Sequence, residues 1–280
     1  MELITGSTGD GKTMQLMLRA FTHLDRGGVF GCNFHFKPGW AWRMAARSYD
    51  HKVEGKPLEE VARCFWQRAF LCGKTESIVQ LANVGRRYVV GPVAKQFDKQ
   101  VMLGLDEGQL YMGPDKYRDN MPWLQLFTQS RKLKLDCVIL AHDVSYIDTK
   151  VRKLLKVISV SMNLAEHWRI PGTDIGWPRG DKWPWLPRPS FILKRYSPLV
   201  KKVHFRFAKY QPWITECYDT DELFDFDNLP SALESQGCLG ENPFAVAAAA
   251  EAAKKRPSWP QPEREADGSY TLYARCLEGA

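Results

Sequence analysis

The sequence lacks the marks of several common protein classes. Its 280 residues contain no run of about 18 apolar residues, so we expect no transmembrane helix. Its 7 cysteines include no C-x-x-C pair, which argues against a disulfide scaffold or zinc knuckle and favours reduced thiols in a cytosol-like compartment. Its 6 histidines lack ligand spacings such as H-x-x-x-H, so we expect no zinc site. The first motif begins at Gly6, which leaves no room for a signal peptide.

Charge of one sign is in excess. The net charge is +7 and the pI is about 9.0, in a chain that is 44% hydrophobic and 25% charged. These two fractions are ordinary for a globular protein, and a chain of this length can bury a core without disulfides. The basic excess favours a polyanionic partner such as nucleic acid or anionic lipid, although a merely basic surface explains the charge equally well.

Strand and helix patterns alternate along the first part of the chain. Met1–Thr5 is predicted to be a strand, Lys12–Leu24 a helix with apolar residues at helical spacing, and Val29–Phe36 a second strand. Further helices are predicted within Pro57–Ala82 (with a break near Cys72–Gly73) and at Pro122–Lys132 and Thr149–Leu155, and further strands at Val101–Leu105, Cys137–Ala141 and Val157–Met162. This order predicts an α/β protein with a mainly parallel sheet flanked by helices.

Three regions are expected. Residues 1–168 form the core domain. Residues 169–228 complete it with a Trp- and Pro-rich insertion and a β-hairpin at Phe191–Tyr196 and Val203–Tyr210. Residues 229–280 are rich in Ala, Pro and Glu, and we expect a tail that is partly disordered or partner-bound, with a small helix at Phe244–Ala253.

The residues GSTGDGKT, from Gly6 to Thr13, fit the phosphate-loop motif G-x-x-x-x-G-K-[ST]. Glycines let the backbone curl so that successive N–H groups point at phosphates, and the following helix adds the positive end of its dipole. Lys12 is expected to contact the β- and γ-phosphates of ATP, and the Thr13 hydroxyl to ligate Mg²⁺. A Gly-rich turn without nucleotide is the weaker interpretation, because a strand pattern precedes the motif and a helix pattern follows it. The predicted nucleotide-binding residues are Gly6, Ser7, Thr8, Gly9, Asp10, Gly11, Lys12, Thr13 and Met14.

Two adjacent acids follow the apolar strand Val101–Leu105. Asp106 is predicted to hold Mg²⁺, usually through water, and Glu107 to polarise the water that attacks the γ-phosphate. Such a pair favours hydrolysis over simple switching. A surface turn is the alternative, since many strands end in Asp or Glu.

A third strand end and two arginines are further candidates for contacts to the γ-phosphate. Cys137–Ala141 leads into His142 and Asp143, either of which could sense this phosphate, although a polar residue is equally expected where a buried strand meets solvent. Arg131 and Arg152 are candidates to act on the site of a neighbouring subunit in a ring, and a solvated or salt-bridged arginine is the alternative for each.

Two segments, Lys37–Arg43 and Trp168–Arg188, mix tryptophan with cations. Aromatic faces beside cations suit a single-stranded DNA track, because bases stack on the rings while phosphates pair with the cations. Tryptophan is equally suited to subunit interfaces and to cores, so DNA contact, interface and plain packing all stay open for both segments.

In their order, these motifs resemble the zonular occludens toxin family, which includes the gene-one assembly ATPases of filamentous phages. The resemblance spans roughly residues 1–225 and rests on MELITGSTGDGKT, LGLDEGQLYM, FTQSRKLKLDCVILAHDVSYIDTKVRKLL and the late CYDTDELF. It implies a RecA-like core related to the FtsK/HerA motors and to viral genome-packaging ATPases. It also implies ATP-driven packaging or extrusion of viral DNA by a homo-oligomeric ring that works with capsid or membrane assembly proteins of the virus. The implied location is the host cytoplasm, the periphery of the inner membrane or the virion.

The sequence departs from the family in two ways. Members usually carry a transmembrane helix after the ATPase domain, and its absence here favours a soluble packaging motor over membrane-embedded extrusion. Where members often have an Arg-His pair and a strand-end Gln, this sequence has Ser130-Arg131 and His142. The alternatives are an extrusion ATPase that acts through a partner membrane protein, a nucleotide-kinase-like phosphotransferase and a non-catalytic nucleotide-dependent scaffold.

Overall fold

The computed structural model describes residues 1–88, 101–115, 120–163, 190–198, 203–218, 230–248, 263–264 and 270–271. The chain divides into two compact units, Met1–Gly240 and Glu241–Ala280. The tail was expected to begin at residue 229, and the first unit extends to Gly240. The second unit contains a helical segment at 243–248 and two short strands, β10 (Glu263–Arg264) and β11 (Tyr270–Thr271).

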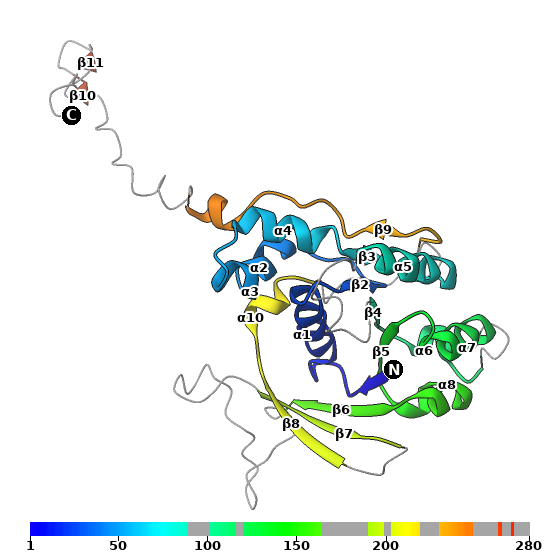
Figure 1. Ribbon diagram of the computed structural model, residues 1–280. Coiled ribbons are helices and arrows are strands. Elements are labelled where there is room, and N and C mark those ends of the chain that lie inside the picture. Colours follow the sequence, from blue (N-terminus) through cyan, green and yellow to red (C-terminus); the bar gives the residue numbers. More distant parts are fainter. Residues whose placement is uncertain are drawn as a thin grey trace, which may run out of the picture. The chain divides into compact units, whose positions relative to one another are not determined.

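Within the described residues, nine strands form one sheet in the order β8-β7-β6-β1-β5-β4-β2-β3-β9 (Figure 1). The strands from β6 to β3 in this order run parallel, whereas β7, β8 and β9 join as antiparallel neighbours. Their bounds are β1 Glu2–Thr5, β2 Val29–Cys32, β3 Ala69–Leu71, β4 Val101–Leu105, β5 Leu135–Ala141, β6 Val157–Asn163, β7 Ser190–Tyr196, β8 Val203–Lys209 and β9 Glu234–Ser235.

The strand before the phosphate loop, β1, is separated from the acid-bearing strand β4 by β5. The predicted α/β fold with a mainly parallel sheet is confirmed. The predicted hairpin, β7 and β8, is also present, and it extends the main sheet because β7 pairs with β6.

Helices cover both faces of the sheet (Figure 1), which explains why its central strands are apolar throughout rather than alternating. Ile4 packs with α1, α2 and α4 in one core, whereas the next residue back, Leu3, packs with α5, α7 and α8 in the other. The helices are α1 Lys12–Asp25, α2 Trp40–Ala45, α3 Tyr49–Lys52, α4 Leu58–Trp66, α5 Thr75–Tyr88, α6 Gln109–Met112, α7 Asn120–Gln129, α8 Thr149–Leu154 and α10 Pro212–Thr215.

Three local predictions are corrected by the structure. The expected helix break near Cys72–Gly73 contains the strand β3, whose three residues are too few to give a strand signal. The second strand ends at Cys32 rather than Phe36, and the side chain of the next residue, Asn33, bonds to the backbone of Asp106 just after β4. The helix predicted at Pro122–Lys132 starts two residues earlier and ends at Gln129.

Residues 230–240 lie along the β3 edge of the sheet, where tail was expected. Gln236 is 2% exposed, and its side chain forms hydrogen bonds to the backbone of two separate segments, the one after β2 and the strand β3. Its Nε2 donates to the carbonyl oxygens of Phe34 (3.0 Å) and Phe70 (3.3 Å), and its Oε1 accepts the Phe36 N–H at 3.1 Å. Apolar pattern alone does not reveal such a contact, because the residue that makes it is polar.

No helix in the described part of the chain is long and apolar enough to span a bilayer.

Candidate nucleotide-binding site

The phosphate loop connects the carboxyl end of β1 to the first turn of α1. Gly9 and Gly11 have φ angles of 86° and 72°, values that favour glycine over residues with a Cβ. At Gly11 a Cβ atom would lie only 2.7 Å from the Phe191 ring of β7, so packing requires glycine there as well. The loop thus has the curled backbone that the sequence predicted.

Asp10 fastens the loop to β6. Its carboxylate accepts the backbone N–H of Ser7 at 2.7 Å and that of Asn163 at 2.9 Å, and the Ser161 hydroxyl donates to its carbonyl oxygen at 2.6 Å. Asp10 is 2% exposed. Sequence reasoning placed Asp10 among the nucleotide-binding residues, and in the structure its carboxylate is engaged in holding the loop, which keeps its negative charge bonded to amides.

Lys12 lies inside the loop. Its Nζ donates to the carbonyl oxygens of Gly6 at 2.7 Å and Ser7 at 2.9 Å. Burial lowers the pKa of this ammonium, and the nearby charges of Asp106, Glu107 and Asp10 oppose that shift. The ammonium therefore stands where a phosphate group would approach the loop, and a bound anion would compensate the cost of its burial.

Thr13, in the first turn of α1, contacts Asp106 at the carboxyl end of β4. The Thr13 hydroxyl donates to Asp106 Oδ2 at 2.8 Å, and the backbone N–H of Glu107 donates to Oδ1 at 2.8 Å. Burial raises the pKa of the Asp106 carboxyl, although these two hydrogen bonds and the Lys12 charge act in the opposite direction. A hydroxyl and a carboxylate are oxygen ligands of the kind that Mg²⁺ prefers, so this pair fits the metal that the motif implies.

Glu107 follows at the end of β4 in a left-handed conformation, with φ 50°. Such a conformation costs of order 1 kcal/mol for a residue with a Cβ. Its carboxylate accepts a hydrogen bond from Gln109 Nε2, and its Oε2 lies 3.4 Å from His142 Nε2. Glu107 is thus held between a side chain of α6 and one at the end of β5, beside the phosphate loop.

Asn33, at the end of β2, was missed by sequence reasoning. Its Nδ2 donates to the carbonyl oxygen of Asp106 and its Oδ1 accepts the Asp106 N–H, both at 2.8 Å. The Tyr111 hydroxyl accepts a further hydrogen bond from Nδ2 at 3.0 Å. The predicted strand Val29–Phe36 includes Asn33, so the place of this residue at the carboxyl edge of the sheet becomes apparent only once β2 is found to end at Cys32.

A cavity of about 360 Å³ joins these groups. Thr8, Gly9, Lys12, Thr13, Asp106, Glu107 and His142 line its polar side, and Met14, Phe34, Phe191, Tyr210 and Tyr218 are among its apolar lining. Tyr218 belongs to the late CYDTDELF segment, and burial raises the pKa of its hydroxyl. Most predicted site residues thus surround one cavity at the carboxyl edge of the sheet.

The two arginine candidates lie elsewhere. Arg131 is exposed just after α7, and the guanidinium of Arg152 donates to Thr149 Oγ1 at 2.9 Å within α8. Neither is among the described residues that line the cavity. Their action on a neighbouring subunit stays a prediction.

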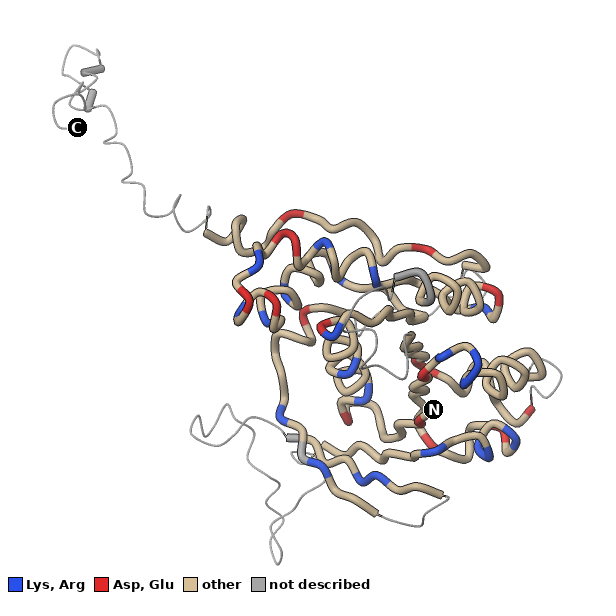
Figure 2. Tube along the Cα trace, in the orientation of Figure 1, with Lys and Arg blue, Asp and Glu red and all other residues tan. Residues whose placement is uncertain are grey.

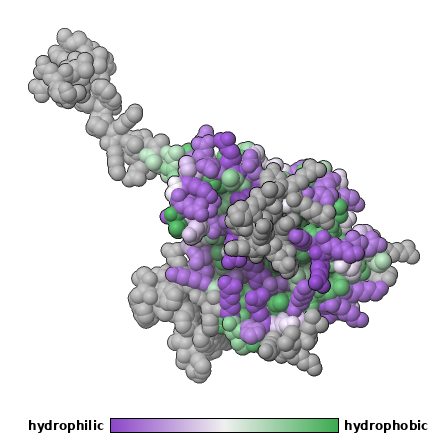
Figure 3. All heavy atoms as spheres, viewed as in Figure 1, coloured by the Kyte–Doolittle hydropathy of each residue, from purple (hydrophilic) through white to green (hydrophobic). Residues whose placement is uncertain are grey.

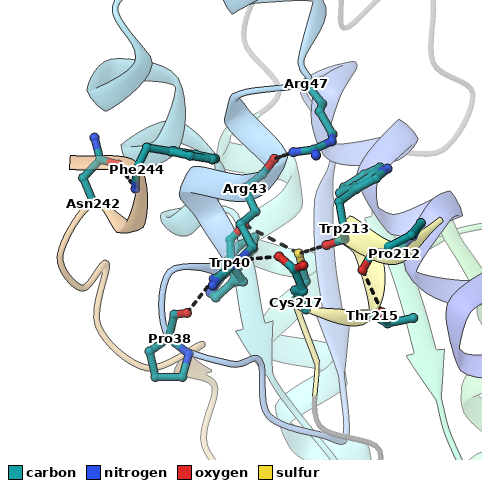
Figure 4. A network of polar contacts seen from close by, with 11 residues as sticks. Pro38, Trp40, Arg43, Arg47, Pro212, Trp213, Thr215, Cys217, Asn242 and Phe244 are labelled. Carbon is teal, nitrogen blue, oxygen red and sulfur yellow. Dashed lines mark hydrogen bonds and ion pairs between the residues drawn. The ribbon is translucent and has the colours of Figure 1, made fainter. Parts of the chain in front are cut away.

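The first aromatic-basic segment is part of the core. Trp40 and Trp42 are 1% and 7% exposed, so their faces are closed to bases. Figure 4 shows α2 beside α10, where Cys217 Sγ donates to the Trp40 carbonyl and the Arg43 side chain donates to the Pro38 carbonyl. The packing interpretation of Lys37–Arg43 is therefore correct and the DNA track is wrong there. Trp168–Arg188 lies outside the described residues.

Comparison with known proteins supports the resemblance. The family model described as zonular occludens toxin matches residues 46–168, which is less than half of the chain. No curated protein sequence matches. Two similar solved structures, each at 12% identity, are the N-terminal domain of zonular occludens toxin from Neisseria meningitidis (TM-score 0.41; 78% of this chain and 97% of that one) and the genome packaging NTPase B204 from Sulfolobus turreted icosahedral virus 2 with ATP-gammaS (TM-score 0.40; 75% and 97%).

The cytoplasmic domain of the type VII secretion ATPase EccC from Thermomonospora curvata is a third, at 13% identity and a TM-score of 0.38, over 75% of this chain and 24% of that one. All three TM-scores lie below 0.5, and no function is transferred on that basis. The resemblance to the zonular occludens toxin family is confirmed by the family model. The predicted P-loop layout is confirmed by the order of the sheet and by the backbone of the phosphate loop.

Proposed function

We propose that this protein hydrolyses ATP to move viral DNA during virion assembly or genome packaging. The single observation that carries the proposal is the meeting of Lys12, the Thr13–Asp106 pair and Glu107 at one cavity. Family similarity and the net charge of +7 support a DNA substrate.

The loop residues would perform the binding. Backbone N–H groups of the loop and of the first turn of α1 would donate hydrogen bonds to the phosphate oxygens. Lys12 would exchange its bonds to the Gly6 and Ser7 carbonyls for bonds to phosphate oxygens. Mg²⁺, held by Thr13 and Asp106, would neutralise charge on the β- and γ-phosphates. The aromatic side of the cavity, which includes Phe34 and Phe191, offers apolar surface to the base.

Glu107 is the proposed general base. Its carboxylate would take a proton from the attacking water, and Gln109 and His142 would hold it in position through the contacts already described. His142 would also donate to the γ-phosphate as it leaves. Asp106 would thereby bind the metal and Glu107 would activate the water. A nucleotide switch does not require a second carboxylate for the water.

In this proposal the protein works as a homo-oligomeric ring, with viral DNA and capsid or membrane assembly proteins as partners, in the host cytoplasm, at the periphery of the inner membrane or on the virion. Arg131 or Arg152 would then complete the site of the next subunit. Mixing Lys12→Ala subunits with Arg131→Ala or Arg152→Ala subunits tests this role. Recovery of turnover in a mixture of two inactive variants supports action between subunits, whereas full activity of both arginine variants alone contradicts it.

The main experiment measures ATP turnover by the wild type and by Lys12→Ala, with and without single- and double-stranded DNA, with the oligomeric state recorded in the same buffer. We expect the wild type to be an oligomer whose ATP turnover is stimulated by DNA. The Lys12→Ala variant should show no turnover. ATP turnover by a stable monomer at a rate that DNA does not change would contradict the proposed motor function. Phosphate transfer to a nucleoside monophosphate would instead identify the kinase-like alternative.

A further inference from the structure

A second cavity, of about 800 Å³, lies between α1 and the strands β7 and β8. It shares no lining residue with the nucleotide cavity and has more than twice its volume. Side chains of the β1 and β5 strands form part of its lining. The side of α1 that faces this hollow is therefore not fully covered by the rest of the described chain.

The described lining of this cavity, which we call the basic groove, is rich in cations. Five cationic side chains lie there against two carboxylates: Arg19, Arg26, Arg195, Arg206 and Lys209, with Glu2 and Asp136. Figure 2 shows Lys and Arg along α1 and along β7 and β8, and Figure 3 shows mainly hydrophilic residues around α1 in the same view. The groove thus carries an excess of positive charge from three separate elements.

Both carboxylates already have cationic partners, and Asp136 Oδ1 lies 3.3 Å from the N-terminal ammonium. Glu2 Oε2 lies 2.7 Å from Arg19 and 3.2 Å from Arg195, and the Ser159 hydroxyl donates to the other oxygen. The Glu2 side chain is only 12% exposed, so water screens this cluster weakly. Two guanidinium groups on one carboxylate leave one net positive charge facing the groove.

Two cations on the edge strand add to this charge. Arg206 and Lys209 belong to β8, the first strand of the sheet, and both are exposed. Within the described residues neither side chain has a hydrogen bond or an ion pair. Their charges are therefore available to a ligand that lies along the groove.

An orphan hydrogen-bond donor supports a ligand independently of charge. Gln15 lines the groove and is 6% exposed, and its Nε2 has no hydrogen-bond partner among the described residues. A buried amide without a partner costs about 1–3 kcal/mol, so a persistent one indicates a group that supplies an acceptor. Phosphate oxygens are such acceptors, and the buried Gln15 amide would turn toward the groove to reach them.

We propose that the basic groove binds the phosphate backbone of DNA, a proposal that rests on the function proposed above and specifies where its substrate lies. Phosphates suit both the cation excess and the unpaired Gln15 amide. The groove is open and its cations come from α1, β7 and β8, so it suits a polymer with repeating negative charges. A compact anion would need only one small group of cations. Because α1 begins at Lys12 and also carries Gln15 and Arg19, one rigid helix joins the nucleotide site to this groove.

The test measures DNA binding in the absence of nucleotide. Fluorescence anisotropy gives the Kd for a labelled single strand and for its duplex at several salt concentrations. The groove variant is Arg206→Glu with Lys209→Glu. Its matched control is Lys153→Glu with Lys156→Glu, which makes the same charge change at exposed positions that do not line the groove. Thermal melting of each variant establishes that it is folded.

We expect the groove variant to bind about tenfold more weakly, and the slope of log Kd against log salt to fall by about 1.4 for the single strand or 1.8 for the duplex. The control should bind like the wild type. Equal weakening of both variants, or a wild type that binds neither DNA, overturns the proposal. Gln15→Leu adds a second readout, since it should weaken DNA binding while raising the melting temperature; unchanged binding would also count against the groove.

Lys12→Ala separates the two proposals. We expect it to keep DNA binding in the absence of nucleotide while losing turnover. If the wild type hydrolyses no ATP but its DNA binding still depends on Arg206 and Lys209, the motor function fails and the groove stands. If turnover is normal and DNA binding is unchanged by substitution of these two residues, the groove proposal is overturned while the proposed function stands.

Discussion

Asn33 holds the backbone of Asp106 on both sides, with its Nδ2 donating to the Asp106 carbonyl and its Oδ1 accepting the Asp106 N–H, each at 2.8 Å. Both residues are buried, so water cannot replace either bond. The pair links the end of β2 to the end of β4 and fixes the direction in which the Asp106 carboxylate points toward Thr13.

Asn33→Ala should therefore impair both stability and metal use. It leaves a buried N–H and a buried carbonyl without partners, and we expect a loss of about 2–3 kcal/mol in the free energy of unfolding, measured with urea. The Mg²⁺ concentration for half-maximal ATP turnover should rise. The control is Asn83→Ala, at an exposed position on α5, which should change neither quantity. A stable Asn33→Ala variant with ordinary Mg²⁺ dependence would show that Asp106 is positioned by other contacts.

Glu107→Gln should separate nucleotide binding from hydrolysis. The amide keeps the shape of the carboxylate but cannot take a proton from water, so turnover should fall by about 10²–10⁴-fold. Affinity for a fluorescent ATP analogue should stay within about twofold, because the loop and Lys12 hold the phosphates. Glu76→Gln, on α5, serves as the control. Substantial turnover in Glu107→Gln would transfer the role of base to another group.

Asp106→Asn should stabilise the protein in a pH-dependent way. Burial raises the pKa of the Asp106 carboxyl above its ordinary value of 3.8, so folding takes up a proton between pH 3.8 and the raised pKa. The free energy of unfolding that this group contributes therefore falls as pH rises through that window. Asparagine does not titrate, so the stability advantage of the variant should grow with rising pH and then level off.

Urea unfolding of both proteins across this pH range measures the difference. The variant should also lose Mg²⁺-dependent turnover, since it removes a carboxylate ligand. A constant difference at all pH values would mean that Asp106 does not titrate differently in the folded chain.

Shortening the chain should locate the end of the first unit. A chain that ends at Gly240 retains Gln236 and should unfold at nearly the same urea concentration as the full chain. A chain that ends at residue 228 loses the contacts of Gln236 and should be clearly less stable. Gln236→Leu in the full chain should cost about 2–3 kcal/mol, because the buried Phe36 N–H loses its acceptor, whereas Ser235→Ala at an exposed position should cost little. Equal stability of the two shortened chains would assign residues 230–240 to the tail.

The features that could be predicted from the sequence were those that local sequence determines. The Gly9, Gly11 and Lys12 pattern specifies its own backbone shape, and an apolar strand that ends in Asp106 and Glu107 is visible without knowledge of the sheet. Asn33 was not visible, because its role depends on β2 pairing with β4, which are far apart in the sequence. Trp40 likewise is buried in a core that includes Ile214 of α10, more than 170 positions later. Long-range partners decide these positions, and periodicity does not encode them.

The central place of β1 in the sheet has a consequence during synthesis. Its two neighbours are β5 and β6, and the Asp10 carboxylate bonds to a backbone amide 153 residues later. At roughly 5–20 residues per second a ribosome needs roughly 8–30 s to make that stretch. For most of this interval, until β5 begins at Leu135, the earliest-made strand has neither neighbour, and it lacks β6 until Val157–Asn163 is made. A nascent chain therefore exposes an apolar segment that must be shielded until its last partner emerges.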